Sequence, residues 1–107
     1  MSSARTMKFT GVSGTQYQFE LYPWNTTWNP VAVVYVVLRF DGAQWKVLYV
    51  GETEDVKKRF AKHERQPCFD RHQKTHLAVR QESSVDRRLA IERDIMNYYT
   101  PPCNREI

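Results

Sequence analysis

The feature that most constrains this chain is an unbroken apolar run of eight residues, Val31 to Leu38. A strand with one wet face alternates apolar and polar residues, so this run is typical of a strand buried on both faces. Asp41-Gly42 then signals a tight turn, and Trp45 to Val50 follows as a second strand. The sequence therefore predicts a β-hairpin that begins at Val31 and forms the centre of the domain.

Weaker patterns predict the elements around this hairpin. Residues 17–21 alternate apolar and polar side chains and indicate a half-buried strand, whereas residues 1–7 read as a loose polar start. Helices are expected from about Asp55 to Arg65 and, after a serine cap, up to about Tyr99, with a strand over 75–81 between them. This order predicts an α+β fold, with a small three-stranded, mostly antiparallel sheet flanked by helices and an added N-terminal β-hairpin.

The length of the chain fits one compact domain. It has 107 residues, of which residues 1–30 are expected to form an extension packed on a module of residues 31–107. No apolar run reaches the ~18 residues of a membrane span, and the N-terminus lacks the apolar stretch of a secretory signal. We therefore expect a cytoplasmic protein with no membrane partner, in which Cys68 and Cys103 are reduced thiols.

The charge of the chain is only mildly basic. Sixteen Lys and Arg residues against twelve Asp and Glu give a net charge of +4. This total is compatible with nucleic acid as a partner and equally with an ordinary solvated helix face. The positions say more than the total, because many of the basic residues lie in one segment: Lys57, Lys58, Arg59, Lys62, His63 and Arg65, then Arg71, His72, Lys74 and His76.

Two polar residues of the first predicted helix lie beside its apolar side. Helical geometry places Arg59 and His63 on the flank of the stripe formed by Val56 and Phe60. An arginine there needs an anion, which the protein or a ligand can supply. Asp55, one turn before Arg59, is the simplest internal partner.

Glu92 is unusual on the second predicted helix, because the same geometry places it within an apolar arc that includes Val85, Leu89 and Met96. A carboxylate in that position is costly unless it is paired or bound to a metal. Arg88 lies one turn earlier, so an ion pair within the helix is the simplest interpretation. A functional carboxylate is the other, and the helix alone leaves both open.

Taken in order, these landmarks resemble the GIY-YIG nuclease family. The motifs that carry the resemblance are Val33-Val34-Tyr35, Tyr49-Val50-Gly51, Arg59, His63, Glu92 and Pro101-Pro102-Cys103-Asn104. Arg59 follows the second motif's tyrosine by ten residues, and His63 comes four residues later. The resemblance covers about residues 31–104. It departs from the family pattern at Val33, where a glycine is usual, and at Glu52, where many relatives have a small polar or basic residue.

The resemblance implies an endonuclease that depends on Mg²⁺, for which Mn²⁺ can substitute, and that hydrolyses DNA phosphodiester bonds. Glu92 would hold the metal ion, which would neutralise charge on the phosphate and on the leaving oxygen. Arg59 would grip the phosphate and stabilise the crowded transition state. Asn104 would orient a side chain or water near the metal, and Gly51 would let the backbone pass close to the substrate.

Three residues compete as the base that activates water. In different members of the family, the tyrosine that corresponds to Tyr35 or to Tyr49 is assigned this role. A free tyrosine is only about 0.1% ionised at neutral pH, so this role favours a pKa lowered by about two to three units. His63, with an ordinary pKa near 6.5, can accept or relay the proton instead. We expect the two phenols, Arg59 and Glu92 to converge on one pocket that solvent can reach.

DNA binding is expected to be electrostatic and sensitive to salt, because the candidate contacts are Gly51 and five cations, Lys57, Lys58, Lys62, Arg71 and Lys74. A chain of this size has no separate DNA-reading domain, so we expect low sequence specificity, or specificity supplied by a homodimer or a partner protein. The alternative is a non-catalytic nucleic-acid-binding or protein-interaction module that retains the fold. Glu52 and an Arg88–Glu92 pair would favour that alternative.

Two further signals have simpler explanations. A zinc site from Cys68, His72 and His76 would need tight ligand pairs, and only the two histidines have a suitable spacing. A free thiol and surface histidines are therefore expected. Trp24 and Trp28 can stack on bases, but they lie beside prolines, and hydrophobic lids over the hairpin are the simpler use.

Overall fold

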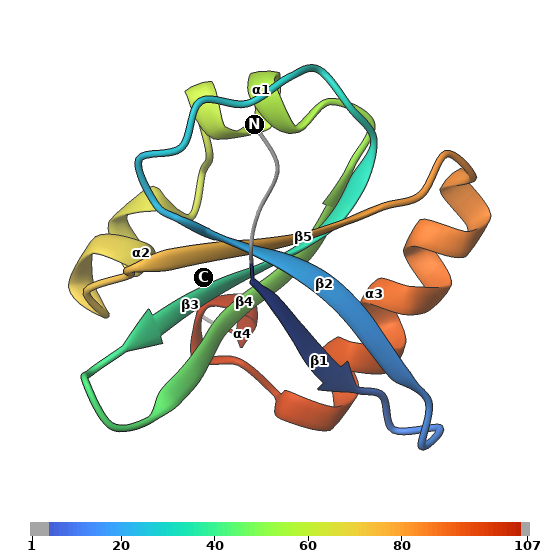
Figure 1. Cartoon of the computed structure of the whole chain (residues 1–107), viewed down its shortest axis with the longest axis horizontal. Coiled ribbons are helices and arrows are strands. Elements are labelled where there is room, and N and C mark those ends of the chain that lie inside the picture. Colours follow the sequence, from blue (N-terminus) through green and yellow to red (C-terminus); the bar gives the residue numbers. More distant parts are fainter. Residues whose placement is uncertain (1–4, 106–107) are drawn as a thin grey trace.

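The computed structural model describes residues 5–105, and an antiparallel sheet of five strands forms its centre (Figure 1). The order of the strands across the sheet is β1-β2-β5-β3-β4. The elements are β1 (Thr6–Thr10), β2 (Gln16–Pro23), β3 (Val33–Phe40), β4 (Trp45–Thr53), α1 (Val56–Ala61), α2 (Gln66–Arg71), β5 (His76–Gln81), α3 (Val85–Tyr99) and α4 (Pro102–Arg105). The predicted α+β class is confirmed, but the prediction of a three-stranded sheet is wrong.

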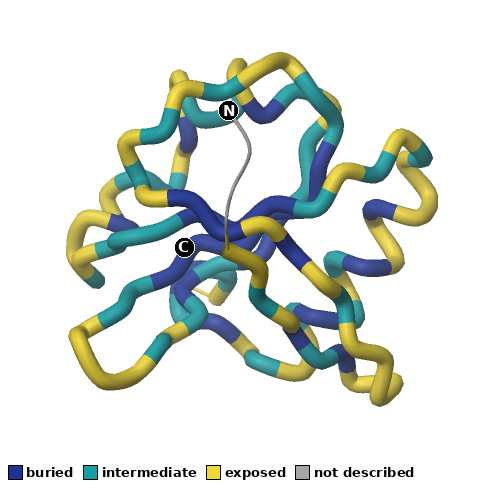
Figure 2. The backbone as a smooth tube through the Cα atoms, in the orientation of Figure 1, coloured by how far each residue is buried: buried dark blue, intermediate teal, exposed yellow. Residues whose placement is uncertain are grey.

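The continuous apolar run forms the most buried strand, β3 (Figure 2). Alternate side chains of β3 enter two hydrophobic clusters on opposite faces of the sheet. Tyr35 belongs to the cluster that includes residues of α1 and α2, and Val36 belongs to the cluster covered by α3. The predicted hairpin of β3 and β4 is confirmed, with a register shift after Val37. Because β4 lies at the end of the sheet, its outer edge faces other parts of the chain.

The N-terminal hairpin accounts for the two additional strands. β1 pairs with β2 as an added hairpin predicts, although part of β1 falls in the segment expected to be a loose start. Residues 1–4 of that segment lie outside the described residues. β2 pairs with β5 along its other side, so the hairpin continues the central sheet. Phe9 and Phe19 join it to the cluster under α3, with ring centroids 5.1 Å apart.

The first predicted helix, Asp55 to Arg65, is wrong in its length. α1 ends at Ala61, because Lys62 adopts an extended conformation with φ −155° and ψ 107°. The short helix α2, which was expected to be a loop, begins a few residues later. His63 therefore lies in the turn between two helices, where its ring is buried, and not on the face of a helix.

The starts of these two helices also differ from the prediction. Asp55 lies just before α1 as its cap, since its carboxylate accepts a hydrogen bond from the Lys58 backbone N–H at 3.0 Å. Pro67 was expected to follow the end of a helix. It lies instead in the first turn of α2, where a proline needs no backbone N–H.

α3 has the predicted bounds, but its buried face is rotated. Its buried residues are Arg88, Ile91 and Ile95, whereas Leu89 is 39% exposed. Glu92 is therefore half-buried on the flank of this face, and the charged residue at the centre is Arg88. Within residues 5–105, no helix combines the length and the apolar character needed to cross a membrane.

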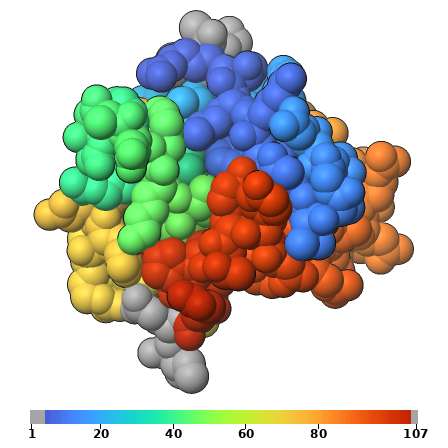
Figure 3. All heavy atoms as spheres, turned by 90° about the horizontal axis from the view of Figure 1, so that it is seen from below, coloured from blue at the N-terminus to red at the C-terminus, as the bar shows by residue number. Residues whose placement is uncertain are grey.

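The C-terminal segment lies between the β3–β4 hairpin and the N-terminal hairpin (Figure 3). Its short helix α4 contains Cys103, which is joined to Cys68 of α2 by a disulfide bond. The expectation of reduced thiols is therefore wrong, because the fold brings α2 and α4 together in one hydrophobic cluster. His72 lies near both sulfur atoms, but these atoms are bonded to each other, and His76 is not part of the group.

Candidate active site

Gly51 of β4 marks the point where the predicted site residues meet. A Cβ atom at this position would lie 2.5 Å from both Cζ and Oη of Tyr35 and 2.9 Å from Cε2 of Tyr49. The two rings are stacked, with centroids 6.1 Å apart and planes inclined by 25°. Only glycine leaves them this space. Gly51 is itself buried, so in this structure it makes room for the two phenols and does not offer a surface to DNA.

A buried hydrogen bond joins Tyr35 to His63, with 2.8 Å between Oη and Nε2. The other ring nitrogen of His63, Nδ1, accepts a hydrogen bond from the Arg65 backbone N–H at 3.0 Å. A nitrogen that accepts carries no proton, so the proton of the neutral imidazole is on Nε2. His63 therefore donates to Tyr35, and the phenol oxygen is the acceptor.

Burial determines the ionisation of these groups. Loss of hydration, followed by the nearby charge of Arg59, lowers the pKa of His63 to about 4. Burial also raises the pKa of Tyr35, and this effect exceeds the opposing effect of Arg59. The pKa of Tyr49 is likewise raised by burial. At neutral pH the protein alone therefore holds two protonated phenols and a neutral imidazole, and the lowered tyrosine pKa that the mechanism favours is not present.

Arg59 is held by a carboxylate that the sequence did not indicate. Its two Nη atoms each lie 2.7 Å from one carboxylate oxygen of Glu64. This hydrogen bonding raises the pKa of Arg59 and lowers that of Glu64 to about 2. Residues five apart do not face each other on a helix, so the pair forms only because α1 ends at Ala61. Asp55, the expected partner, caps the helix instead.

The predicted DNA-binding cations surround α1 and α2. Lys58, Lys62 and Arg59 line an open hollow of about 410 Å³, together with the acids Glu54 and Asp55. Lys57 lines a separate cavity. Arg71 is exposed at the end of α2, and Lys74 forms an ion pair with Asp70. The cations nearest to Arg59 are thus Lys58 and Lys62.

Glu92 reaches this region from the opposite face of the sheet. α3 covers that face, and Glu92 lies near Glu52 of the edge strand, whose charge influences its pKa. There it is close enough to Tyr49 to raise the pKa of that phenol. Burial and, next, the negative charge of Glu52 raise the pKa of Glu92 itself. Two carboxylates meet here, and a cation would lower the cost of holding Glu92 ionised.

Arg88 pairs with Glu52 and not with Glu92, so the predicted ion pair within the helix is wrong. Arg88 Nε lies 2.8 Å from Glu52 Oε1, and Nη1 donates to the backbone oxygens of Glu82 and Ser83. This pair also explains the unusual carboxylate at position 52, which turns toward α3 and is neutralised there. The two residues are 36 positions apart, so only the fold brings them together.

Asn104 seals the outer edge of β4 beside Gly51. Its Nδ2 donates to the Val50 backbone oxygen at 2.9 Å, and its Oδ1 accepts from the Val50 N–H at 2.8 Å. The side chain thus replaces the neighbouring strand that an edge strand lacks. Asn104 positions the strand that carries Gly51, and its amide is engaged on the backbone instead of being directed at a metal or a water.

The residues around Glu92 fit a hard divalent cation. Mg²⁺ is held by oxygen atoms, commonly one or two carboxylates, and keeps several of its waters. Glu92 supplies one half-buried carboxylate, with that of Glu52 close to it. Across residues 5–105, no cluster of three or more His, Cys, Asp or Glu ligands includes Glu92. A cation at Glu92 would therefore be bound by carboxylate and water, and not by a protein cage.

The structure thus brings together Tyr35, Tyr49, Arg59 and His63, whereas Glu92 approaches Tyr49 from the other face of the sheet, so the five residues do not share one open pocket. Tyr35 is 1% exposed, with its oxygen enclosed by His63, Arg59 and Gly51, whereas Tyr49, Arg59 and Glu92 are partly exposed. In comparisons with known proteins, no family model matches the sequence, and no curated protein and no solved structure matches the chain.

Proposed function

We propose that this protein is an endonuclease of the GIY-YIG type that uses Mg²⁺ or Mn²⁺ to hydrolyse DNA phosphodiester bonds. The observation that carries the proposal is the meeting of three chemical groups around Gly51. They are the Arg59 guanidinium, the hydrogen-bonded pair of Tyr35 and His63, and the Glu92 carboxylate. They can serve as a phosphate clamp, a proton acceptor and a cation ligand.

Arg59 binds the phosphodiester in this proposal. Its fork of N–H groups suits two phosphate oxygens as well as it suits a carboxylate. A phosphate that enters the hollow lined by Lys58 and Lys62 would therefore exchange with Glu64 on the same guanidinium. Arg59 then stabilises the negative charge that builds up at phosphorus as the attacking water adds.

Tyr35, once its own proton has been lost to solvent and the phenolate has formed, accepts the proton of the attacking water. Both His63 Nε2–H and the Arg59 guanidinium donate toward its oxygen, and such donors stabilise a phenolate. His63 is a positioning residue, because Nε2 already carries a proton and Nδ1 is engaged by the backbone. As the water's O–H bond breaks, its oxygen bonds to phosphorus and the bond to the leaving oxygen opens. A cation held by Glu92 would neutralise charge on that leaving oxygen.

The DNA is bound mainly through its phosphates. The hollow beside Arg59 and the exposed Arg71 and Lys57 offer cations, and we find no separate reading domain within residues 5–105. We therefore propose low sequence specificity, with a second copy of the chain or a partner protein as the source of any stricter choice.

A non-catalytic nucleic-acid-binding or protein-interaction module is the second candidate. One observation favours it, namely that the Tyr35 oxygen is enclosed and Arg59 is already neutralised by Glu64. In that case the enclosed site would have no catalytic activity, and DNA would bind to the surface cations alone.

The variant Glu92→Gln separates the two candidates, because it removes the cation ligand and keeps the shape of the side chain. We expect it to abolish nicking of a plasmid in Mg²⁺ or Mn²⁺ while DNA binding persists. Glu54→Gln, which removes an exposed acid near the same hollow, is the matched control and should nick normally. Equal activity of Glu92→Gln and wild type would reject Glu92 as the ligand. Failure of the wild type to cut plain, flapped and branched DNA would favour the binding module.

Arg59 and Lys58 provide a second comparison on one helix. Arg59→Ala should slow cleavage by about a hundredfold or more at saturating DNA, as expected when a transition-state contact is lost. Lys58→Ala should instead mainly weaken binding. Equal effects of the two substitutions would argue against a catalytic role for Arg59.

A further inference from the structure

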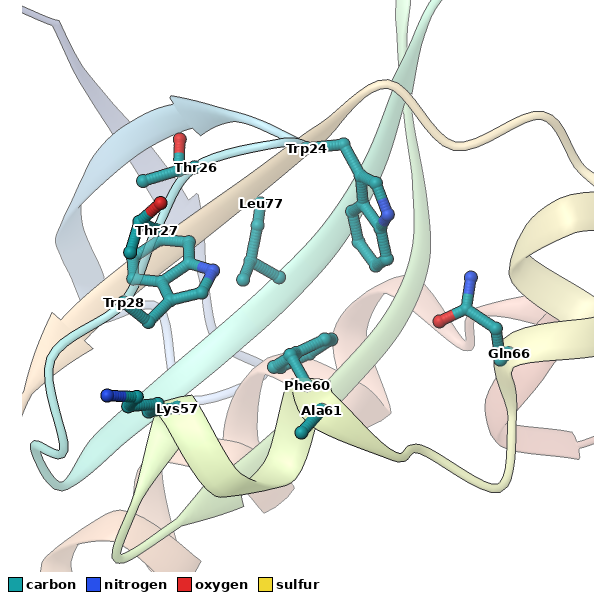
Figure 4. Close-up of a pocket in the computed structure, with 9 residues that line it drawn as sticks. All are labelled: Trp24, Thr26, Thr27, Trp28, Lys57, Phe60, Ala61, Gln66 and Leu77. Atoms are coloured by element: carbon teal, nitrogen blue, oxygen red, sulfur yellow. The ribbon is translucent and has the colours of Figure 1, made fainter.

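A second cavity lies between α1 and the loop that connects β2 to β3 (Figure 4). Its volume is about 240 Å³. Figure 4 shows Trp24 and Trp28 on opposite sides of it, with Leu77 between them and Phe60 on the side of α1. Trp24 and Trp28 were expected to act only as hydrophobic lids, but they also form the walls of a cavity, because a space remains between them. The cavity is smaller than the ~300 Å³ from which typical ligand pockets start, so it suits a single ring system.

The chemistry of the cavity favours a flat, polar-edged aromatic group. Both indole rings are partly exposed, and across residues 5–105 neither indole N–H has a hydrogen-bond partner. In Figure 4 the ring nitrogen of Trp28 lies on the side of the ring that faces Leu77. A nucleobase could stack on these faces, and its edge could accept a hydrogen bond from that N–H.

The charge at the cavity favours a nucleotide over a plain apolar group. Lys57 is the one charged residue among the described residues that line it, and its ammonium group is exposed. Thr26, Thr27 and Gln66 add neutral polar groups. An exposed cation at an aromatic pocket provides a contact for the phosphate attached to the base, which an apolar peptide side chain would not need.

Phe60 connects this cavity to the candidate active site. Its ring centroid lies 5.6 Å from that of Trp24 on one side and 4.8 Å from that of Tyr35 on the other. It also lies 5.3 Å from the ring centroid of His63. The ring of Phe60 therefore lies between the cavity and the ring of the proposed base, so that neighbouring nucleotides of one strand can span the two.

We propose that this cavity binds one unpaired nucleobase of the DNA strand held at Arg59, and that the protein therefore prefers DNA containing an extruded or single-stranded nucleotide. This inference rests on the proposed function for the position of the phosphate. The base itself is recognised by Trp24, Trp28 and Phe60, and the binding does not require cleavage.

The test compares binding of the full-length protein to two duplexes in EDTA, where no cleavage occurs. One duplex carries a single unpaired adenosine, and the other carries an abasic residue at the same place. We expect the adenosine duplex to bind roughly 5- to 100-fold more tightly and to quench tryptophan fluorescence, as a stacked base does. Equal affinity for the two duplexes would overturn the proposal in the wild-type protein, whatever the folding of any variant.

Variants then locate the effect. Trp28→Ala should reduce the affinity for the adenosine duplex to that for the abasic one and leave the abasic affinity unchanged, and Trp28→Phe should retain much of the difference. Trp45→Ala, which lies in the β3–β4 hairpin and stacks on Phe40, is the matched control. An equal loss on both duplexes in Trp28→Ala would reject the cavity as a base site. Base-dependent binding without any cleavage in Mg²⁺ would reject the nuclease proposal and leave this site standing.

Discussion

Arg59 and Glu64 are joined by two parallel hydrogen bonds of 2.7 Å, in the geometry with which a guanidinium binds a phosphate. Glu64 is the more exposed partner, with 62% of its side chain accessible against 25% for Arg59. In the proposed function the carboxylate therefore occupies the position that a phosphodiester would take, and exchange of one for the other keeps the mostly buried Arg59 side chain paired. In the absence of DNA, both Nη atoms of Arg59 are therefore occupied by a carboxylate of the same chain.

Removing this carboxylate should increase the affinity for DNA. In Glu64→Gln the guanidinium loses its ionic partner and becomes free for phosphate, so we expect the Kd for a short duplex at low salt to fall by about 5- to 10-fold. Filter binding or fluorescence anisotropy measures this change.

The control for Glu64→Gln is Glu54→Gln, which changes the net charge equally beside the same hollow, whereas Glu64 is the residue that hydrogen-bonds the Arg59 guanidinium. It should improve binding by no more than a general charge effect. If the two variants bind equally well, Glu64 does not compete for the phosphate site.

The rate of cleavage should increase with pH well beyond neutrality. Burial raises the pKa of Tyr35 above its ordinary value near 10, so the fraction of phenolate, and with it the rate, should rise about tenfold per pH unit between pH 6 and 9. Single-turnover cleavage by the wild type, Tyr35→Phe and Tyr49→Phe measures this dependence. Tyr35→Phe should abolish it and Tyr49→Phe should retain it. The reverse result would assign the base to Tyr49.

Sequence patterns predict those elements of the fold that depend on residues close together in the chain. β3 and β4 are confirmed because an apolar run and an Asp-Gly turn define them without reference to the remaining chain. An N-terminal hairpin was predicted but the bounds of β1 were not, since β1 depends on β2, which depends in turn on pairing with β5 almost sixty residues away. The premature end of α1 has the same origin, because burial of His63 against Tyr35 requires the turn that breaks the helix.

The same holds for the candidate site: some of its residues were predicted, but the ion-pair partners that the fold brings to them were not. The resemblance to a known family singled out Tyr35, Tyr49 and Arg59, which the structure brings together, but not the partners that control them. Glu64 and Glu52 were missed as ion-pair partners, because one pair needs a helix to end and the other joins two distant segments. The acid at position 52 was visible as unusual in the sequence, and a search for its cation on the last helix would have pointed to Arg88.

The buried imidazole of His63 should make stability depend on acidity. Its pKa is lowered to about 4 in the fold, against about 6.5 in the unfolded chain, so protons bind preferentially to the unfolded chain between these values. Its contribution is complete above pH 6.5 and is lost as the pH falls toward 4, by up to roughly 3 kcal/mol. Urea unfolding at pH 4.5 and 7 measures the loss. In His63→Gln, which keeps a donor for Tyr35 but does not titrate, the loss should be clearly smaller; an unchanged loss would assign it to other groups.

Asn104 should contribute to stability through the edge of β4. Asn104→Ala removes both hydrogen bonds to Val50 and leaves two backbone groups without their partner, so we expect the free energy of unfolding to fall by about 1–3 kcal/mol. Asn97→Ala, an exposed asparagine on α3, is the control and should change it by less than about 0.5 kcal/mol. Full stability of Asn104→Ala together with lost cleavage would instead support a direct role in catalysis.

The disulfide between Cys68 and Cys103 should stabilise the segment that carries Glu92. It closes a loop over a sequence separation of 35 residues, which includes β5 and α3 with Glu92. Loop-closure entropy alone corresponds to about 3–4 kcal/mol for a loop of this length. Urea unfolding with and without a reducing agent should show a loss of this order in the wild type. The double variant Cys68→Ser, Cys103→Ser should be less stable from the outset and insensitive to the reductant. Equal stability of the oxidised and reduced wild type would mean that the contacts of α2 and α4 hold these helices together without the covalent bond.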